Sequence, residues 1–337
     1  MGSYRTAARP LFFAIPPEAA HRLAGVILRL PLPWRRIGNA MLDPALETSL
    51  AGIRLRNPVG LAAGFDKSCR YLLALGELGF GYVVAGTVTR RPRRGNPKPR
   101  IVRRPPSASL VNSMGLPNRG APYAADRLRR GRRTGPVLIS LADEQIEDVM
   151  ANHAVLEPQV DGVELNVSCP NVSWGRDRDN EEHLRQLLRE LGSRRTKPLF
   201  VKLPPFRTKA ERDAIIAMAR IAEEGGANGL TCFNSLPVPE ARLASREGGL
   251  SGRPLFDHTV AGVAEIHGAT GGRLPINACG GVFTATDAVD CLKAGATTVQ
   301  VYTALIYEGP RIVRRITEGL KERAAGGAAP VAPSRTA

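Results

Sequence analysis

Cysteine, lysine and long apolar runs are scarce in this 337-residue sequence, and each shortage excludes a class of protein. The five cysteines, at positions 69, 169, 232, 279 and 291, form no C-x-x-C pair. This argues against a disulfide framework and against a cysteine-bound metal or iron–sulfur cluster, and it favours a reducing compartment. No stretch approaches the roughly 18–20 unbroken apolar residues of a membrane span. The apolar run at 11–15 is too short for a secretory signal.

Arginine supplies most of the formal net charge of +16, because only seven of the 47 basic residues are lysine. A strongly basic chain raises the hypothesis of a nucleic-acid partner. The arginines, however, recur along almost the whole chain, and the denser groups at 90–94 and 127–133 lack the interleaved aromatics of a single-strand binding platform. We therefore expect no nucleic-acid partner and favour attraction to an anionic membrane surface.

The first 45 residues differ in pattern from the rest of the chain. Apolar spacing predicts helices at 18–30 and at 34–41, each with an apolar face and with arginines elsewhere. Such a pair is either a packed cap on the next domain or an element lying in a bilayer interface, apolar side down. At the other end, residues 324–337 are small and proline-bearing, which predicts a disordered tail.

Residues 46–323 repeat a pattern of apolar strand, loop and helix. The predicted strands lie at 59–62, 82–85, 137–141, 162–166, 199–203, 229–233, 275–278 and 298–302. Predicted helices between them include 181–191, 209–224, 259–269 and 285–294. Eight strands alternating with helices predict a (β/α)8 TIM barrel, an α/β fold with a two-helix N-terminal extension. The strands read as continuous apolar runs, as expected when both faces of a sheet are covered.

Polar and glycine-rich segments come after seven of the eight predicted strands. They lie at 63–67, 86–89, 166–171, 202, 234–235, 280–281 and 303. The loops after the strands of such a barrel meet on one face, which carries the active site. We therefore expect these segments to form one site.

The segment at 166–171 places the Cys169 thiol between the side-chain amides of Asn166 and Asn171. A thiol can remove a proton, and amides, which both donate and accept hydrogen bonds, can hold a planar polar ring beside it. Most cysteines are instead small buried hydrophobic residues. By itself this segment leaves both interpretations open.

Glycines late in the chain indicate a phosphorylated cofactor. Gly280 and Gly281, with Tyr302 and Thr303, offer backbone N–H groups and a hydroxyl where barrels commonly bind phosphate. The glycines at 247–252 form a predicted loop whose backbone a cofactor can approach closely. A set of tight turns is the alternative.

Two of the rare lysines, Lys67 and Lys202, lie at the ends of apolar strands. A lysine there can steady negative charge on a reduced flavin or on a substrate carboxylate. It can equally form a structural ion pair, and the sequence leaves this choice open.

Several motifs together resemble those of dihydroorotate dehydrogenases. They are NPVGLAAGFDK at 57–67, GTVT at 86–89, GNPKPR at 95–100, GLSGRPL at 249–255 and VYTALIY at 301–307. The resemblance covers roughly residues 4–323 in the order of that family. It implies an FMN-bearing barrel that oxidises dihydroorotate to orotate in pyrimidine biosynthesis.

The resemblance also implies roles for individual residues. Flavin contacts would come from Ala62, Ala63, Gly64, Lys67, Thr87, Asn166, Lys202, Ser235, Gly252, Gly280, Gly281, Tyr302 and Thr303. Substrate contacts would come from Lys67, Asn112, Met114, Gly115, Leu116, Asn166, Asn171, Asn234 and Ser235. Cys169 would be the catalytic base that removes the C5 proton while the C6 hydride passes to FMN. No metal site is expected.

The family has two main branches, and this sequence shares features with both. Residues 4–42 resemble the helical extension of the membrane-associated, quinone-using class, and His21 and Arg103 match its quinone site. That class normally uses serine as base, whereas Cys169 and NSMGLPN at 112–118 resemble the soluble class that reduces fumarate or NAD. Ser140 lies where the quinone class usually has an N-x-G-K loop, and it is a weak candidate for a flavin contact.

The extension favours a membrane quinone as electron acceptor, because an amphipathic cap has no evident role for fumarate. We expect peripheral attachment to the cytoplasmic side of the inner membrane, with a soluble cytoplasmic enzyme as the alternative. A fumarate-dependent enzyme, a paralogue that acts on another dihydropyrimidine or on tRNA, and a non-catalytic barrel that binds RNA or a protein partner are the competing hypotheses. The sequence does not set the oligomeric state.

Overall fold

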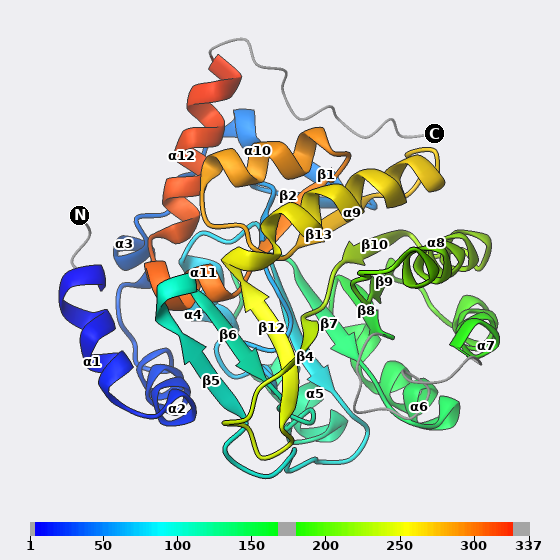
Figure 1. The fold of residues 1–337 in the computed structure, drawn as a ribbon, viewed down its shortest axis with the longest axis horizontal. Coiled ribbons are helices and arrows are strands. Elements are labelled where there is room, and N and C mark those ends of the chain that lie inside the picture. The colour runs from blue at the N-terminus through cyan, green and yellow to red at the C-terminus, as the bar shows by residue number, and fades with distance from the viewer. Residues whose placement is uncertain (1–3, 168–179, 326–337) are drawn as a thin grey trace.

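A computed structural model describes residues 4–167 and 180–325 of the chain (Figure 1). Cys169, Asn171 and the predicted tail beyond residue 325 lie outside the described residues. Eight parallel strands close into a barrel in the order β3-β4-β7-β8-β9-β10-β13-β14. Their bounds are Val59–Leu61, Tyr82–Val88, Val137–Leu141, Gly162–Asn166, Leu199–Leu203, Gly229–Cys232, Ile276–Cys279 and Thr298–Val301. The prediction of a TIM barrel is confirmed.

All eight predicted strands are present, because each apolar run is buried in the way the pattern requires. In β7, β8 and β9 every residue is buried, and their bounds agree with the prediction. The register of β8 and β9 pairs Asn166 with Lys202, so two predicted site residues emerge side by side. The strand ends thus gather the site residues on one face.

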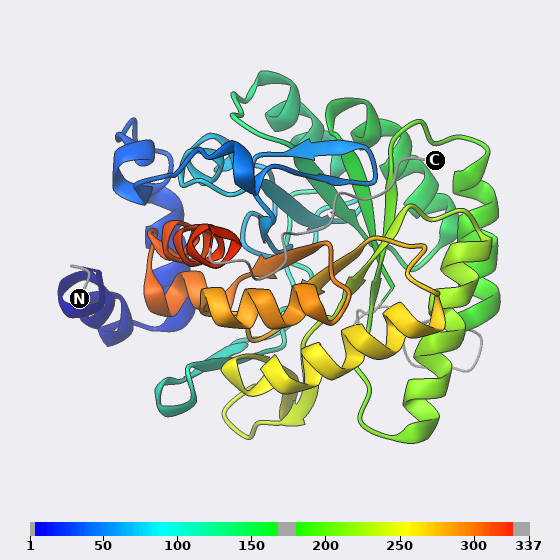
Figure 2. The same ribbon diagram turned by 90° about the horizontal axis from the view of Figure 1, so that it is seen from above.

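Helices surround the barrel (Figure 2). They are α4 Leu72–Glu77, α5 Ala121–Arg130, α6 Ile146–Leu156, α7 Asn180–Gly192, α8 Lys209–Glu224, α9 Phe256–Ala269, α10 Ala285–Lys293, α11 Thr303–Glu308 and α12 Ile312–Ala325. Short 3₁₀ turns lie at Pro44–Leu46, Pro105–Ser107, Glu157–Gln159 and Arg253–Leu255. A capping box of Thr208 and Glu211 begins α8, which satisfies otherwise unpaired N–H groups at that end.

A hairpin of β1 (Thr48–Leu50) and β2 (Ile53–Leu55) covers the end of the barrel where the strands begin. Leu50 and Leu55 pack with Tyr82, Leu138 and Phe200, residues at or near the starts of three strands. Side chains therefore fill that end of the barrel.

A second sheet, not predicted from the sequence, lies outside the barrel in the order β11-β12-β6-β5. Its strands are β5 Ile101–Arg104, β6 Ser109–Asn112, β11 Leu236–Pro239 and β12 Glu247–Gly252. The prediction of a glycine loop at 247–252 is therefore wrong. Glycines disfavour strands, so local pattern gives no strand signal here. Pairing with β6 decides the outcome, and a Cβ at Gly248 would lie 2.7 Å from the carbonyl oxygen of Asn112.

The N-terminal extension contains α2 (Pro17–Ile27) and α3 (Trp34–Gly38), both shorter than predicted. A further helical segment precedes them, with a π-helical turn at Tyr4–Ala8 followed by α1 (Arg9–Ala14). The sequence signal for α1 is weak because the helix has only six residues. It is held by tertiary contacts. The Phe13 ring packs edge-on against the Tyr307 ring, with 5.2 Å between the ring centroids. The Tyr4 hydroxyl donates a hydrogen bond to the Ile306 carbonyl at 2.8 Å.

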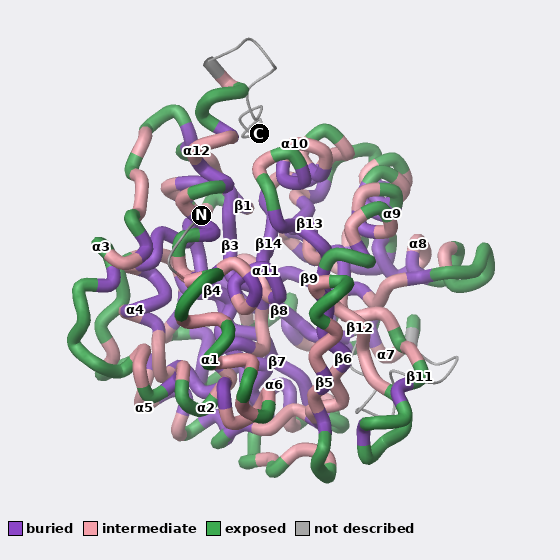
Figure 3. Tube along the Cα trace, turned by 60° about the vertical axis from the view of Figure 1, so that its left-hand side comes forward, coloured by how far each residue is buried: buried purple, intermediate pink, exposed green. Residues whose placement is uncertain are grey.

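Burial differs between the two parts of the chain (Figure 3). The barrel strands are almost wholly buried, whereas α1 has only intermediate and exposed positions and α2 mixes buried, intermediate and exposed ones. Helix α2 packs against β5 of the outer sheet. The extension therefore covers the outer sheet and the open end of the barrel.

Candidate active site

One cavity of about 890 Å³ connects the C-terminal ends of the barrel strands with the N-terminal extension. Its lining includes nearly all of the predicted site residues that the structure describes, namely Ala62, Ala63, Gly64, Lys67, Thr87, Asn112, Met114, Leu116, Asn166, Lys202, Asn234, Ser235, Gly252, Gly280, Gly281, Tyr302, Thr303, His21 and Arg103. Gly115 and Ser140 do not line it. The expectation of one shared site is met for these residues.

Lys202 and Glu164 form a buried ion pair at the base of the cavity. The Lys202 Nζ lies 3.9 Å from Glu164 Oε1, with the two side chains 6% and 0% exposed. Thr231 Oγ1 donates to the second carboxylate oxygen at 2.9 Å. Burial lowers the pKa of Lys202, but the charges of Glu164 and Cys279 outweigh it and raise the pKa above its ordinary value. Lys202 therefore presents a positive charge to the cavity.

Amides and hydroxyls form a continuous chain along one wall. The Asn166 side-chain amide donates to Thr87 Oγ1 at 3.0 Å, and Thr87 shares a hydrogen bond of 3.1 Å with Ser140. The Asn234 amide donates to Asn166 Oδ1 at 3.5 Å. Ser140 is fully buried behind Thr87, so it orients Thr87 instead of facing the cavity. The wall is thus prearranged to hydrogen-bond a polar ring.

Lys67 extends from the loop after β3, and its Nζ donates to the Gly64 carbonyl at 2.5 Å. Asp66 orders this loop by accepting hydrogen bonds from the backbone N–H groups of Arg70 and Tyr71 at 2.8 and 2.7 Å. Burial lowers the pKa of Lys67 to about 8, although the Asp66 charge opposes the shift. An anionic ligand beside the ammonium would restore its charged form.

Glycines shape the end of the cavity near β13 and β14. Gly280 has φ +147° and Gly281 φ +74°, and a Cβ at Gly281 would overlap the backbone nitrogen of Phe256. Thr303 Oγ1 donates to Ser251 Oγ at 3.0 Å across the same region. Backbone N–H groups and hydroxyls with no side chain in the way are a suitable environment for a phosphate.

Gln300 on β14 was not predicted as a site residue, yet it lines the cavity. Its amide nitrogen donates to the Tyr82 hydroxyl at 3.3 Å. Its Oε1 is buried and has no hydrogen-bond partner among the residues that the structure describes. A buried acceptor of this kind needs a donor, which the N–H of a bound heterocycle can supply. With Lys202 and the glycines, it fits the flavin that the sequence resemblance implies.

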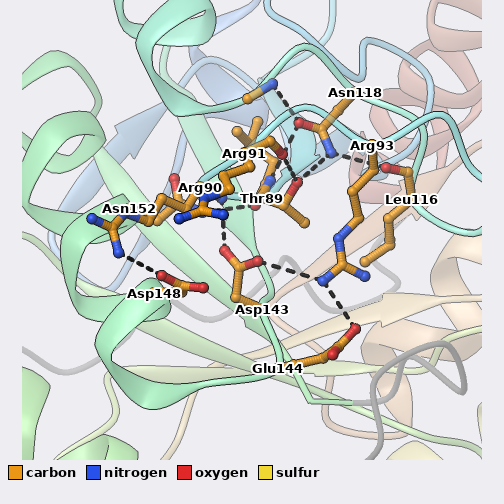
Figure 4. Close-up of polar contacts among 12 residues, drawn as sticks. Thr89, Arg90, Arg91, Arg93, Leu116, Asn118, Asp143, Glu144, Asp148 and Asn152 are labelled. Carbon is orange, nitrogen blue, oxygen red and sulfur yellow. Dashed lines mark hydrogen bonds and ion pairs between the residues drawn. The ribbon is translucent and has the colours of Figure 1, made fainter.

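The segment 112–118, termed here the substrate loop, begins at the last residue of β6 and is anchored at its far end (Figure 4). Asn118 exchanges two backbone hydrogen bonds with Arg93, at 3.0 and 3.1 Å, and its side-chain amide donates to Thr89 Oγ1 at 2.8 Å. Arg93 in turn pairs with Asp143 and Glu144 at 3.6 and 3.1 Å. Burial raises the pKa of Asp143 to about 6. The hydrogen bond that the carboxylate accepts from the Arg90 backbone N–H opposes this rise.

Gly115, in the middle of this loop, has φ +70°, and a Cβ there would overlap the Asn96 side chain. The hypothetical Cβ points at Asn96, and Gly115 itself is not among the residues that line the cavity, so the predicted substrate contact at Gly115 stays a prediction. Its glycine allows the turn that presents the neighbouring Met114 and Leu116 to the cavity.

His21 and Arg103, the quinone-site candidates, line the extension side of the cavity. The His21 ring packs edge-on against Phe65 at 5.6 Å between centroids. The Lys67 charge and burial lower the pKa of His21 to about 3, so its ring is neutral at physiological pH. The Arg103 guanidinium lies 4.6 Å from the Phe13 ring centroid and donates to the carbonyls of Phe13 and Ile15 at 3.3 and 2.9 Å.

The outer surface of the extension is apolar and basic. Six of the seven exposed large hydrophobic side chains in the described ranges are there: Leu11, Leu23, Val26, Leu30, Leu32 and Leu42. The exposed arginines at 22, 29, 35 and 36 form no side-chain ion pair with any residue that the structure describes. Among helices in residues 4–167 and 180–325, none has the length and apolar character needed to traverse a bilayer.

Comparisons with known proteins agree with this geometry. The family model for dihydroorotate dehydrogenase matches residues 45–324. A Sphingopyxis alaskensis protein named dihydroorotate dehydrogenase (quinone) is 38% identical over 332 residues, covering 94% of this chain and 92% of its own. An Erythrobacter litoralis protein of the same name is 38% identical over 328 residues, covering 94% of both chains. The crystal structure of DHODH in complex with ferulenol from Eimeria tenella has a TM-score of 0.81 at 30% identity, covering 94% of this chain and 93% of that one.

Proposed function

Because the chain belongs to the dihydroorotate dehydrogenase family, we propose that it oxidises dihydroorotate to orotate in pyrimidine biosynthesis and passes the electrons to a membrane quinone. One observation carries the proposal: a single cavity joins the polar strand ends to the N-terminal extension. Relatives named dihydroorotate dehydrogenase (quinone) match along the extension as well as the barrel, since the aligned region covers 94% of the chain.

FMN is the proposed cofactor, and when bound it supplies the acceptor for the substrate hydride. Gly280, Gly281 and Thr303 would hold its phosphate, and Lys202 with Thr87 would contact its ring. The free acceptor of Gln300 and the positive charge of Lys202 support this placement. The other flavin contacts named from the sequence line the same cavity.

Cys169 is proposed as the base that removes the C5 proton of dihydroorotate. Asn166 and Asn234, which are hydrogen-bonded to each other, would hold the pyrimidine ring together with Asn112, Asn171 and Ser235. A free thiol has a pKa near 8.5, so a modest local decrease gives appreciable thiolate at neutral pH. Lys67 would bind the substrate carboxylate, and that anion would favour the charged form of the lysine.

The extension is proposed to deliver a lipid-soluble quinone past His21 and Arg103. The neutral His21 ring can donate a hydrogen bond to a quinone oxygen, whereas Arg103 offers a positive charge. The apolar and basic outer surface would lie on an anionic leaflet, placing the protein at the cytoplasmic face of the inner membrane. A soluble cytoplasmic location is the alternative.

Anaerobic half-reactions test the proposal directly. Dihydroorotate is added to the FMN-loaded protein, and the flavin absorbance is monitored. The reduced protein is then mixed with a quinone analogue and with fumarate in parallel. We expect bleaching by dihydroorotate and rapid reoxidation by the quinone alone. Bleaching by dihydrouracil but not dihydroorotate would identify a paralogue, and reoxidation by fumarate would identify a soluble-class enzyme.

Removing residues 1–42 tests the role of the extension. We expect loss of quinone-dependent turnover while saturating dihydroorotate still reduces the flavin, because the barrel keeps its strand-end residues. Equal loss of both half-reactions at saturating dihydroorotate would contradict a specific role of the extension in quinone access.

Vesicle co-sedimentation tests the membrane contact without removing any segment. Leu23→Ser with Val26→Ser removes two apolar side chains that are 45% and 48% exposed on α2. Val155→Ser is the matched control, since Val155 is 44% exposed but lies on α6. We expect weaker binding to anionic vesicles for the α2 variant alone. Equal binding by both variants would contradict the proposed membrane surface.

A further inference from the structure

Arg100 connects the N-terminal extension with the substrate loop through a partly buried, two-point ion pair. Its Nη2 lies 2.7 Å from Glu18 Oε1, and its Nε donates to Glu18 Oε2 at 3.4 Å. The two side chains are 9% and 21% exposed. A guanidinium that engages both oxygens of a carboxylate fixes orientation as well as distance. Helix α2 is thereby held to the segment that precedes β5.

The same guanidinium organises the segment around it. Arg100 Nη1 donates to the carbonyls of Arg94 and Asn96 at 2.8 and 3.1 Å. A Cβ at Gly95 would overlap the Met114 carbonyl and lie 2.5 Å from Arg100 Nη1. The turn at 94–100 therefore closes around the arginine with no room for a larger residue.

This turn is hydrogen-bonded to the substrate loop at three points. The Ser113 N–H donates to the Arg100 carbonyl at 2.9 Å, and the Asn96 N–H donates to the Met114 carbonyl at 3.0 Å. The Asn96 side-chain amide donates to Ser113 Oγ at 3.0 Å. Asn112 and Met114, on either side of Ser113, line the cavity. The shape of this wall thus depends on the turn that Arg100 holds.

Glu18 lies three residues before His21 on α2, so both side chains are on the same side of the helix. Burial raises the pKa of Glu18, but the Arg100 hydrogen bond and charge, aided by Lys98 and Arg22, bring it below its usual range. The ion pair is charged at neutral pH. Lys98 lies 3.6 Å from the same carboxylate, yet its side chain is 57% exposed and contacts only one oxygen.

We propose that the Glu18–Arg100 ion pair is a positioning device that holds the substrate loop in its dihydroorotate-binding shape. Glu18 fixes Arg100, Arg100 fixes the turn at 94–100, and the turn fixes Asn112 to Met114. Substrate affinity therefore depends on how the N-terminal helix α2 packs against the segment that precedes β5. This inference rests on the proposed function, because it names orotate and dihydroorotate as the ligands of the loop.

The coupling is reciprocal by thermodynamic necessity. If the docked position of α2 against the segment before β5 increases the affinity for orotate, bound orotate must stabilise that docked position by the same factor. The rate of amide hydrogen exchange reports how firmly α2 is docked, because local opening exposes its backbone N–H groups. Orotate is therefore expected to slow amide exchange in residues 17–27 as well as in the substrate loop.

The test uses the full-length, FMN-loaded protein and three variants: Glu18→Gln, Glu18→Asp and Lys98→Gln. Orotate affinity is measured from the change in the flavin spectrum, and the rate of flavin reduction is measured against dihydroorotate concentration. We expect Glu18→Gln to weaken orotate binding about tenfold, the effect of losing one charge-assisted hydrogen bond. The limiting reduction rate should change less than about twofold, since no reacting group is altered.

Glu18→Asp should recover part of the affinity because it keeps the charge, and Lys98→Gln should bind orotate as the wild type does. Faster exchange in residues 94–118 should accompany the loss in Glu18→Gln. Equal affinity in Glu18→Gln and wild type would overturn the proposal, as would equal weakening by Lys98→Gln. If Glu18→Gln does not fold, exchange in the wild type decides: protection of 17–27 by orotate supports the coupling, and its absence refutes it. A wild type whose flavin responds to neither orotate nor dihydroorotate would instead refute the proposed function.

Discussion

Replacing Glu164 with glutamine tests whether the charge at the base of the cavity is held by one buried ion pair. The substitution keeps the size of the side chain and leaves an acceptor for the Thr231 hydroxyl, which now donates to Glu164 Oε2 at 2.9 Å. It removes the only ion-pair partner that Lys202 has within the described residues. The Lys202 ammonium would then be buried without a counter-charge.

The expected cost comes from the distance and the burial. Two unit charges 3.9 Å apart attract by about 4 kcal/mol at an effective dielectric constant of about 20. Breaking a buried pair by removing one partner typically costs about 3–5 kcal/mol, because the remaining charge is uncompensated. We expect Glu164→Gln to lose about 3–4 kcal/mol of unfolding free energy at pH 7.

The pH dependence gives an independent check. In the wild type the folded-state pKa of Lys202 is raised above 10.5, so its contribution to stability is complete below that pH and is lost as pH rises through the folded pKa. Without Glu164, burial dominates and the folded pKa falls below 10.5. The cost of the substitution should therefore be greatest near pH 7 and should shrink as the pH approaches about 10.5.

Urea unfolding at fixed FMN concentration, from about pH 7 to about pH 10, measures both effects. Thr231→Val is the matched control, since it removes a hydrogen bond to the same carboxylate but keeps the charge. It should cost less, roughly 1.5–3 kcal/mol, and its cost should not change over this pH range. A loss below about 1 kcal/mol for Glu164→Gln at pH 7, or a loss that does not vary with pH, would refute the reasoning.

Three further predictions concern the catalytic site. Cys169→Ser should slow single-turnover flavin reduction at neutral pH and shift its pH profile to higher pH, because a hydroxyl gives up its proton less readily than a thiol. Unchanged rates and an unchanged pH profile would show that Cys169 is not the base. The second-order rate constant with dihydroorotate should decline above a pH of about 8, where free Lys67 loses the charge that attracts the substrate carboxylate, and Lys67→Met should abolish that alkaline limb. Gly249→Ala would place a Cβ on Ser235 Oγ and should weaken orotate binding, measured by flavin absorbance, whereas Gly268→Ala has open space and should not.

The barrel could be predicted because its signal is local and repeated. Runs such as 137–141 and 199–203 are buried along their whole length in β7 and β9, so hydrophobicity alone marks them. Helix α8 was predicted with its observed bounds, 209–224, and a capping box begins it. The strand-end positions of Lys67, Lys202 and the glycine pair could then be inferred from the topology of the fold.

The outer sheet and helix α1 had no such signal. Strand β12 is rich in glycine and becomes a strand only because β6 and β11 pair with it. Helix α1 is stabilised by residues near the other end of the chain, through Phe13 with Tyr307. The hydrogen bond between Tyr4 and Ile306 also holds this segment, and it joins residues that are 302 positions apart. Local sequence patterns do not predict contacts at such a separation.

Some site residues also could not be identified from the sequence. Gln300 lies within the apolar run of β14, and only the closed barrel turns its side chain toward the cavity. Glu18 and Arg100 are 82 positions apart, and each alone resembles an ordinary surface charge. Gly115 was named from the family motif, and the structure adds the reason for a glycine there, since a Cβ would overlap Asn96.

The sequence by itself determined the periodic apolar strands, the polar residues at their ends and the amphipathic extension, because burial and turn formation depend on neighbours along the chain. Only the tertiary structure decided that barrel and extension share one cavity, that Lys202 is paired with Glu164, and that Arg100 links α2 to the substrate loop. These features depend on distance and desolvation between remote residues. Such quantities exist only after the chain has folded.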